Sequence, residues 1–280
     1  MKINNAINEA TIFLKNSNIQ SAKLDSEILL SKVIKKNRNY ILLNLKQNLT
    51  QKNLIDYKEL IKKRAKGKPT AYLTGKKEFW KFEFNAYEDV LIPRPETELV
   101  VEQVLRLMKN KSKLNILEIG VGSGCIILSI LKEKKNFNGV GMDISKRCVE
   151  ACNKNASKLG LSNRLKLYKS DIDNFELGKY DLIISNPPYI KKLDFNSLDK
   201  NIVNFEPKMA LYGGLDGLSE IKRVINKSSN LIKLNGKLVL EIAFDQKNKV
   251  KKLLEVKGFY INKILKDLAG HDRCIISTKI

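Results

Sequence analysis

The chain has 280 residues, 43% of them hydrophobic and 29% charged, which is typical of globular proteins and long enough for about two domains. Its net charge of +22 comes mostly from lysine (44 of 52 basic residues), which a bias towards A/T-rich codons also produces, so we expect no stable nucleic-acid partner. Its apolar runs are far shorter than the roughly 18 residues of a membrane helix, and residues 1–11 lack the apolar core of a secretory signal, so we expect a cytoplasmic protein without a membrane role.

The segment before residue 70 predicts a small helical bundle. Apolar residues recur in it at helical spacing, and Ser21 and Thr50 are candidate N-caps of two helices. The apolar positions of this pattern include Ile7, Ala10, Leu14, Leu24, Ile28, Leu29, Val33, Leu54, Leu60 and Ile61. Residues 1–75 hold 15 basic and 5 acidic side chains, a net charge of +10, with no catalytic cluster. We therefore expect residues 1–70 to be a docking or packing module.

Residues 71–92 predict a β-hairpin that links two domains. Aromatic and polar residues alternate in residues 79–84 (FWKFEF), which is the period of a strand. A second short apolar run, residues 90–92 (VLI), follows and is the expected second arm.

Strands alternate with helices from about residue 112, so residues 93–280 predict an α/β domain with a doubly wound, mainly parallel sheet. Helices are expected at residues 125–131 and 145–158. The apolar runs that predict strands are residues 114–119, 139–143, 165–168, 180–185, 237–242, 260–264 and 273–277.

Three glycines, Gly120, Gly122 and Gly124, lie in the turn between the first of these strands and its helix. Glycine there permits a tight turn and lets a ligand approach the backbone closely. Asp143 ends the next strand, 19 residues after Gly124, where nucleotide-type folds bind ribose hydroxyls. Cys125 stands where a dinucleotide G-x-G-x-x-G would need glycine, and no G-K-[ST] of a P-loop follows. The pattern favours S-adenosylmethionine over NAD.

The tetrapeptide Asn186, Pro187, Pro188 and Tyr189 follows the strand at residues 180–185, so it should face the same cleft. A planar amide or amino nitrogen is a poor nucleophile because its lone pair is delocalised. The side-chain oxygen of Asn186 and the fixed carbonyl of Pro187 can accept its two hydrogens and aim the lone pair at a methyl group. Tyr189 would add an aromatic wall, and no strong general base is needed.

Cysteine and histidine give no sign of a metal site. The four cysteines, Cys125, Cys148, Cys152 and Cys274, lack C-x-x-C spacing, and a cytosolic chain keeps them reduced. His271 is the only histidine, and no G-x-S-x-G elbow accompanies it. We therefore expect an enzyme that uses no metal.

Together these motifs resemble the HemK/PrmC family, the peptide chain release factor glutamine methyltransferases. The resemblance covers essentially the whole chain. Besides the glycine turn and the tetrapeptide, it rests on residues 68–75 (KPTAYLTG), 78–80 (EFW), 91–98 (LIPRPETE), 205–207 (FEP) and 267–273 (DLAGHDR).

The resemblance implies a class I, Rossmann-like methyltransferase domain at residues 93–280, with residues 1–70 docking the protein substrate. That substrate would be the glutamine of the Gly-Gly-Gln motif of class I release factors, methylated on its side-chain amide and bound by Asn186 to Tyr189. S-adenosylmethionine would be the cofactor, S-adenosylhomocysteine the product, and the enzyme a monomer. The implied cofactor-binding residues are Glu118, Gly120, Val121, Gly122, Ser123, Gly124, Asp143, Asp171, Asn186, Arg94 and Thr97.

Several of these interpretations have alternatives. Residues 94–97 can equally be a proline-rigidified helix start, with Glu96 and Glu98 favouring the helix N-terminus. Ile172 and Ala243 stand where relatives often carry an aromatic residue and a glycine, which weakens any claim of adenine stacking at Ile172. The alternative activity is methylation of an adenine amino group in nucleic acid, which would suit the basic charge. A binding module without catalysis is the third possibility.

Overall fold

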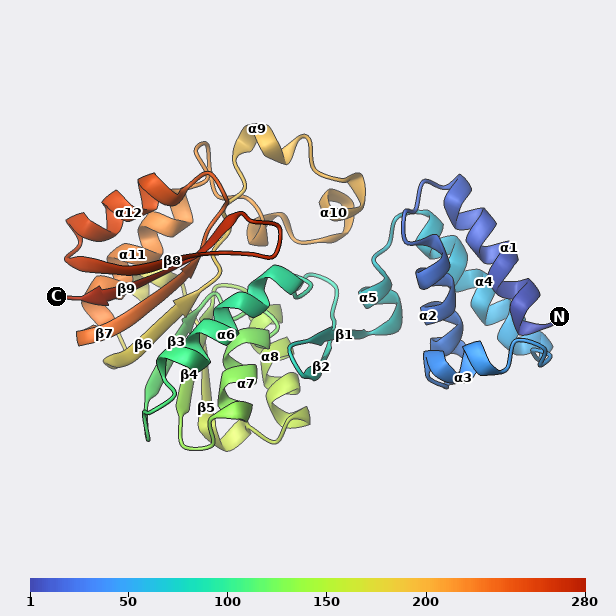
Figure 1. Ribbon diagram of the computed structural model, residues 1–280, viewed down its shortest axis with the longest axis horizontal. Coiled ribbons are helices and arrows are strands. Elements are labelled where there is room, and N and C mark those ends of the chain that lie inside the picture. The colour runs from blue at the N-terminus through green and yellow to red at the C-terminus, as the bar shows by residue number, and fades with distance from the viewer. The chain divides into compact units, whose positions relative to one another are not determined.

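The computed structural model describes residues 1–280, except for the side chain of Lys200. The chain forms two compact units, one of Met1–Lys76 with Asp199–Phe205 and one of Lys77–Leu198 with Glu206–Ile280 (Figure 1). None of the helices in the described part of the chain is both long enough and apolar enough to cross a membrane.

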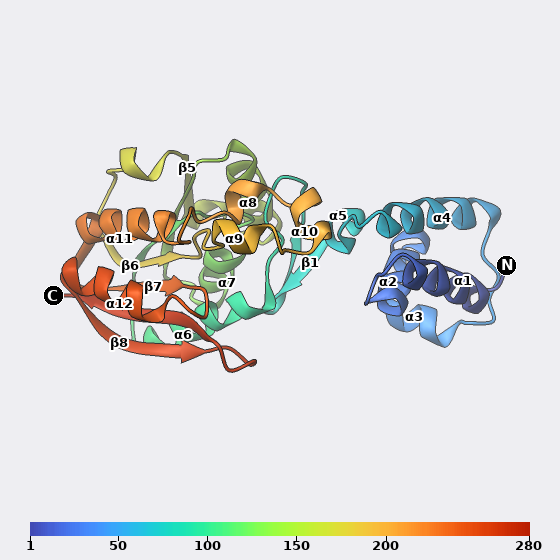
Figure 2. The same ribbon diagram turned by 90° about the horizontal axis from the view of Figure 1, so that it is seen from above.

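The first unit is helical, and its three longest helices lie together (Figure 2). Side chains between them form one apolar core. Its core includes Ile7, Leu14, Leu29 and Tyr57, all nearly inaccessible to solvent. Asn37 and Thr50 cap their helices by accepting the backbone N–H groups of Tyr40 and Asn53. The helices of this unit are α1 (Ile3–Asn16), α2 (Ala22–Ile34), α3 (Arg38–Leu43), α4 (Gln51–Ala65), α5 (Thr70–Thr74) and α10 (Lys200–Phe205).

A buried carboxylate joins α2 to the helices that follow it. Asp25 is 5% exposed and accepts from Arg64 Nε at 2.8 Å, Thr70 Oγ1 at 2.9 Å and Ser21 Oγ at 2.7 Å. Ser21 occupies the N-cap position of α2 as predicted, but its hydroxyl donates to Asp25 and makes no capping hydrogen bond to the backbone. Leu24, predicted to open the apolar stripe, is 45% exposed, because α2 turns the face with Asp25 inward instead.

The hairpin forms, but its arms differ from the predicted ones. Strands β1 (Lys76–Phe79) and β2 (Phe82–Asn85) pair in a two-stranded sheet, so the aromatic run ends the first arm, forms the turn and begins the second arm. The chain reverses at Trp80, which has a positive φ of 58° and donates its backbone N–H to Glu98 Oε1 at 2.8 Å. Residues 90–92 are not a strand, because the Ile92 N–H is bound by the Glu206 carboxylate and Pro93 has no N–H.

The second unit is built on a seven-stranded sheet in the order β5-β4-β3-β6-β7-β9-β8. The first five are parallel, whereas β9 runs antiparallel to both β7 and β8. The chain moves outward from β3 to β4 and β5 and then crosses to β6 on the other side of β3, which creates a topological switch point. The strands are β3 (Asn115–Ile119), β4 (Asn138–Asp143), β5 (Leu165–Lys169), β6 (Tyr180–Ser185), β7 (Ile232–Glu241), β8 (Phe259–Lys266) and β9 (Asp272–Lys279).

Helices cover both faces of this sheet, α6, α7 and α8 on one and α11 and α12 on the other (Figure 1). Alternate strand residues enter the two cores, so that Ile116 and Leu182 face the first group and Leu117 and Ile183 the second. The α-helices of this unit are α6 (Glu98–Leu107), α7 (Cys125–Glu133), α8 (Lys146–Lys158), α9 (Lys192–Phe195), α11 (Ser219–Leu231) and α12 (Lys247–Val256). Its short 3₁₀ helices are η1 (Pro95–Thr97), η2 (Ser162–Arg164), η3 (Ile172–Asn174) and η4 (Lys208–Ala210).

Gly124 is required by packing as well as by backbone conformation. Its φ is +80°, and a Cβ there would lie 2.5 Å from Cys152 Sγ and 2.8 Å from Leu128 Cδ1. Gly160 has a similar φ of +70° but no atom within 4 Å of the same position, so it is a matched control. We expect Gly160→Ala to cost about 1–2 kcal/mol for the left-handed backbone.

Gly124→Ala should cost roughly 1–3 kcal/mol more than Gly160→Ala, because the extra methyl overpacks a closed core. Urea unfolding of both variants checks this difference. Equal losses of stability in the two variants would show that the contact with Cys152 is harmless.

Candidate active site

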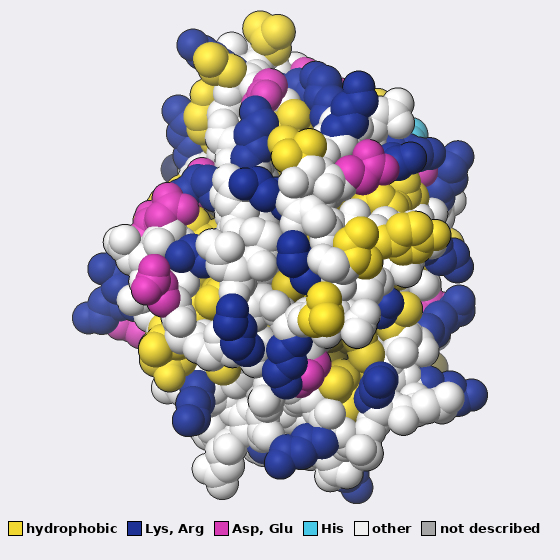
Figure 3. Space-filling model, turned by 90° about the vertical axis from the view of Figure 1, so that its left-hand side faces the viewer, with side chains coloured by type: hydrophobic (Ala, Val, Ile, Leu, Met, Phe, Trp, Pro, Cys, Tyr) yellow, Lys and Arg dark blue, Asp and Glu magenta, His cyan; other side chains and the backbone are white. Residues whose placement is uncertain are grey.

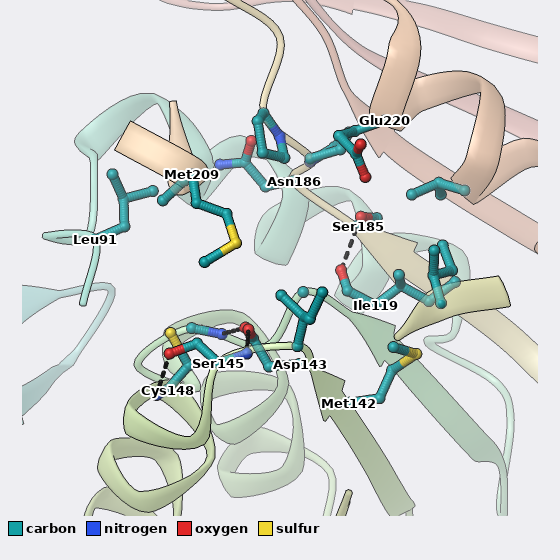
Figure 4. Close-up of a pocket in the computed structure, with 18 of the residues that line it drawn as sticks. Leu91, Ile119, Met142, Asp143, Ser145, Cys148, Ser185, Asn186, Met209 and Glu220 are labelled. Carbon is teal, nitrogen blue, oxygen red and sulfur yellow. Dashed lines mark hydrogen bonds between the residues drawn. The ribbon is translucent and has the colours of Figure 1, made fainter. Parts of the chain in front are cut away.

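A cavity of about 390 Å³ opens at the carboxyl ends of β3, β4 and β6, beside the switch point. This volume falls in the range of small-molecule sites, roughly 300–1,000 Å³. Asp143 and Ser145 lie on one side of it, Asn186 and Glu220 on the opposite side, and Met209 extends into the space between (Figure 4). The fold thus brings together side chains from three strand ends.

The glycine turn forms one wall of the cavity. Gly120 and Gly122 line it with φ values of +75° and +52°, and a Cβ on either would meet no atom within 4 Å. The backbone N–H groups of Gly120 and Val121 donate to Met142 O at 2.9 and 3.0 Å, which ties the turn to β4. Open space next to two bare backbone segments fits a ligand that approaches the main chain closely, as a nucleoside-type cofactor does.

Asp143 fastens the turn from the end of β4. Its Oδ2 accepts the Gly122 N–H at 3.0 Å and its Oδ1 accepts the Ser145 N–H at 2.9 Å. Burial raises the pKa of this carboxyl, and the two backbone N–H groups oppose the rise. Each oxygen of a carboxylate has a second lone pair, so Asp143 can hold the turn and still accept from a pair of ligand hydroxyls.

Asp171 lies at the rim of the cavity within a network of charges. It is ion-paired with Arg223 on α11, which also contacts Asp173 at 2.9 Å and Glu220 at 3.0 Å. Arg223 and Glu220 line the cavity themselves. Neither residue can be found from the sequence, because both lie on a helix far away in the chain and belong to no motif.

The tetrapeptide faces the glycine turn across the cavity. Asn186, Pro187 and Pro188 line the cavity, whereas Tyr189 lies behind them against the core. Asn186 Nδ2 donates to Thr97 Oγ1 at 3.1 Å, which leaves its Oδ1 as the free acceptor of the amide. Gln246, 1% exposed, donates to Tyr189 O at 3.1 Å and so fixes the end of the tetrapeptide.

Several residues expected to contact a cofactor do not line the cavity. Glu118 is 2% exposed, and its Oε2 accepts the Ile127 N–H at 2.9 Å, which caps the start of α7. Burial raises the pKa of this carboxyl well above its usual range. Arg94 is ion-paired with Glu206 at 2.6 Å. For these residues the structure supports a role in shaping the site.

The other four expected cofactor residues are also placed within the protein, three of them around the glycine turn and Thr97 beside Asn186. Val121 is buried in the core, and Ser123 is 4% exposed with its carbonyl bound by Asn155 Nδ2 at 2.9 Å. Gly124 packs against Cys152, and Thr97 is 2% exposed beside Asn186. None of these residues lines the cavity.

Two further residues that no sequence motif identifies lie at the cavity or behind it. Ile144 follows Asp143 and lines the cavity although 45% of its surface is exposed. A large apolar residue directly after the polar residue that ends a strand is the signal in the sequence that could have revealed it. Glu241 ends β7 and contacts Tyr189, and a lone carboxylate at the end of an apolar strand is a comparable signal. In the described residues no cluster of three or more His, Cys, Asp or Glu could hold a metal ion.

Solved structures share this fold. The chain superposes on a ribosomal protein L11 methylase from Lactobacillus delbrueckii with a TM-score of 0.51 and 18% identity, over 68% of this chain and 82% of that one. A methyltransferase from Pyrococcus furiosus gives a TM-score of 0.52 at 16% identity, over 70% and 88%. The sheet order, the helices on both faces and the glycine turn define a class I S-adenosylmethionine-dependent methyltransferase fold.

Sequence relatives specify the family. Residues 5–75 match the PrmC N-terminal domain and residues 97–261 the methyltransferase small domain. Release factor glutamine methyltransferases of Clostridium acetobutylicum and Buchnera aphidicola are 35% and 36% identical, over 100% of this chain and 99% and 100% of theirs. A bifunctional methyltransferase of Rickettsia conorii is 34% identical over 99% of this chain but only 58% of its own length. The chain belongs to the release factor glutamine methyltransferase family.

Proposed function

We propose that the enzyme transfers a methyl group from S-adenosylmethionine to the side-chain amide nitrogen of the glutamine in the Gly-Gly-Gln motif of class I release factors. The observation that carries this proposal is the free Oδ1 acceptor of Asn186 at the edge of the cavity, across from the glycine turn. Family membership supports the same substrate class.

The residues of the cavity fit the cofactor. The open space beside Gly120 and Gly122 accommodates a group that packs on the backbone, and the remaining lone pairs of Asp143 suit ribose hydroxyls. We propose that Asp171, held by Arg223, lies near the adenine. When bound, S-adenosylmethionine supplies an electrophilic methyl group on a positively charged sulfur.

The tetrapeptide prepares the acceptor nitrogen. An amide nitrogen attacks poorly while its lone pair is delocalised, and acceptors on both of its hydrogens favour the geometry in which that pair points at the methyl group. We propose Asn186 Oδ1 and the Pro187 carbonyl as these two acceptors, with Pro188 as a wall of the glutamine site and Tyr189 packed behind it. The methylated nitrogen is acidic enough to lose its extra proton without a dedicated base.

A basic surface is the feature that would favour nucleic acid as the substrate. On the face seen in Figure 3, Lys and Arg side chains are scattered among acidic and apolar ones. Phosphate backbones are bound by basic residues that gather along a groove or stripe. The scattered charges on this face therefore do not support nucleic acid as the substrate. The relatives named above are release factor glutamine methyltransferases, which does not favour adenine as the acceptor.

Radiolabelled methyl transfer tests the substrate. A purified release factor, its Gln→Ala loop variant and A/T-rich DNA are offered in parallel with S-adenosylmethionine. We expect label on the intact release factor alone. Label on DNA, or equal label on the Gln→Ala variant, would overturn the proposal.

A further inference from the structure

Behind the tetrapeptide lies a carboxyl group that the proposed transfer does not use. Glu241 ends β7 and is 1% exposed. Its Oε1 accepts the Tyr189 hydroxyl at 3.1 Å, whereas its Oε2 is buried without a hydrogen-bond partner among the described residues. A buried carboxyl oxygen that no donor reaches is costly, so a neighbouring hydroxyl that can turn its hydrogen towards the carboxyl is expected.

Thr97 connects this carboxyl to the site. Its side chain is 2% exposed, its Oγ1 accepts Asn186 Nδ2 at 3.1 Å, and its hydroxyl is close enough to Glu241 to lower the pKa of that carboxyl. A hydroxyl has one hydrogen to donate. If that hydrogen goes to Glu241, the oxygen of Thr97 can only accept, and Asn186 must turn its NH₂ towards it.

We propose that Glu241 and Thr97 are positioning residues, in which the ionised carboxyl of Glu241 orients the Thr97 hydroxyl so that Asn186 presents its amide oxygen to the substrate. This inference rests on the proposed function, since it assigns the orientation of the acceptor on which that function depends. We call this proposed connection from Glu241 through Thr97 to Asn186 the relay. A carboxylate can only accept hydrogen bonds, so the hydrogen bonds of the relay run in one direction. A neutral carboxyl can donate, and it then lets Asn186 present its NH₂ group instead.

The surroundings of Glu241 set the pH at which the relay operates. Burial raises the pKa of its carboxyl to about 7, and the hydroxyls of Thr97 and Tyr189 and the charge of Arg273 limit the rise. The other titratable groups that act on it or are influenced by it are Glu96 on η1, Cys125 on α7 and Cys274 on β9. Burial raises the pKa of both thiols, so they stay neutral near pH 7.

Two substitutions separate the relay from simple packing. Thr97→Val removes the hydroxyl at nearly constant volume and should lower the single-turnover rate of methyl transfer about 10-fold to 100-fold, with the Kd for S-adenosylmethionine unchanged, because misplacing a reacting group costs rate. Thr97→Ser restores a hydroxyl and should recover most of the rate. Thr278→Val is the matched control, because this threonine is 9% exposed on β9 and pairs with Lys237, far from the carboxyl end of β7.

The pH profile tests the carboxylate. The wild-type rate should rise with pH through about 7, where Glu241 ionises, and Glu241→Gln should be slower and lose that step. Wild-type rate in Thr97→Val, or the same pH step in Glu241→Gln, would overturn the relay while leaving the proposed function intact.

A measurement without substrate tests the positioning role of Glu241 and Thr97 independently of the proposed methyltransferase function. The side-chain NH₂ signal of Asn186, assigned by its loss in Asn186→Asp, should shift with pH through about 7 in the wild type and stay constant in Glu241→Gln. If the wild type methylates no release factor, the proposed function fails and this titration still decides the relay. An Asn186 signal that responds identically in both proteins would refute it.

Discussion

Asn186→Ala should lower methyl transfer to a release factor at least about 100-fold, the loss typical of removing one preorganised polar group from an active site. The change removes the Oδ1 acceptor at the cavity and nothing from the glycine turn, since Asn186 Nδ2 is bonded to Thr97. The Kd for S-adenosylmethionine should therefore change little. Single-turnover transfer and calorimetric titration of the cofactor measure the two effects separately.

Asn138→Ala is the control for this prediction. Asn138 is exposed and starts β4, at the opposite end of the sheet from the tetrapeptide. It should keep the wild-type rate. Normal turnover by Asn186→Ala would mean that the amide oxygen does not activate the acceptor, and the mechanism would have to be abandoned.

Asp143→Ala should weaken S-adenosylmethionine binding about 100-fold, because hydrogen bonds to a charged group are worth roughly 1.5–3 kcal/mol each. Two effects act together: the ligand loses its carboxylate, and the N–H groups of Gly122 and Ser145 lose their acceptor. Asp143→Asn keeps the shape without the charge and should fall between the wild type and Asp143→Ala.

Ligand-induced thermal stabilisation measures this binding loss, since a ligand stabilises the fold according to its concentration relative to Kd. Asp181→Ala is the matched control. Asp181 is likewise a strand carboxylate that accepts a backbone N–H, from Asn115 at 2.9 Å, but it lies near the start of β6. A full stabilisation of Asp143→Ala by the cofactor would show that this carboxylate is dispensable.

The sheet could be predicted because each strand is an apolar run between turn residues. Residues 180–185 form β6 as expected, and the strand expected at 139–143 begins one residue earlier in β4. The buried faces of the helices in the first unit were harder to predict, because Asp25 is buried by partners on α4 and α5 that lie far away in the sequence. Local helical spacing cannot reveal such partners, so Leu24 was expected on the buried face.

In the candidate site, too, residues that belong to local motifs could be predicted from the sequence, whereas residues held by distant partners could not. The glycine turn and Asn186 are local motifs at strand ends, and the strand order brings them to one cavity. The position of Glu118 beside the glycines predicts a contact with the cofactor, yet its side chain turns into the protein and caps α7. Glu241 could not be linked to Asn186 from the sequence, since β7 lies beside β6 only in the folded sheet and Thr97 reaches Asn186 from η1.

The central claim is that the acceptor is a glutamine side-chain nitrogen, and tandem mass spectrometry of the methylated release factor tests it most directly. After incubation with S-adenosylmethionine and wild-type enzyme, fragment ions should place one added methyl group on the side-chain amide of the glutamine in the Gly-Gly-Gln peptide. The same incubation with Asn186→Ala should leave that peptide unmodified. A methyl group on a carboxylate, a lysine or any other residue would contradict the account.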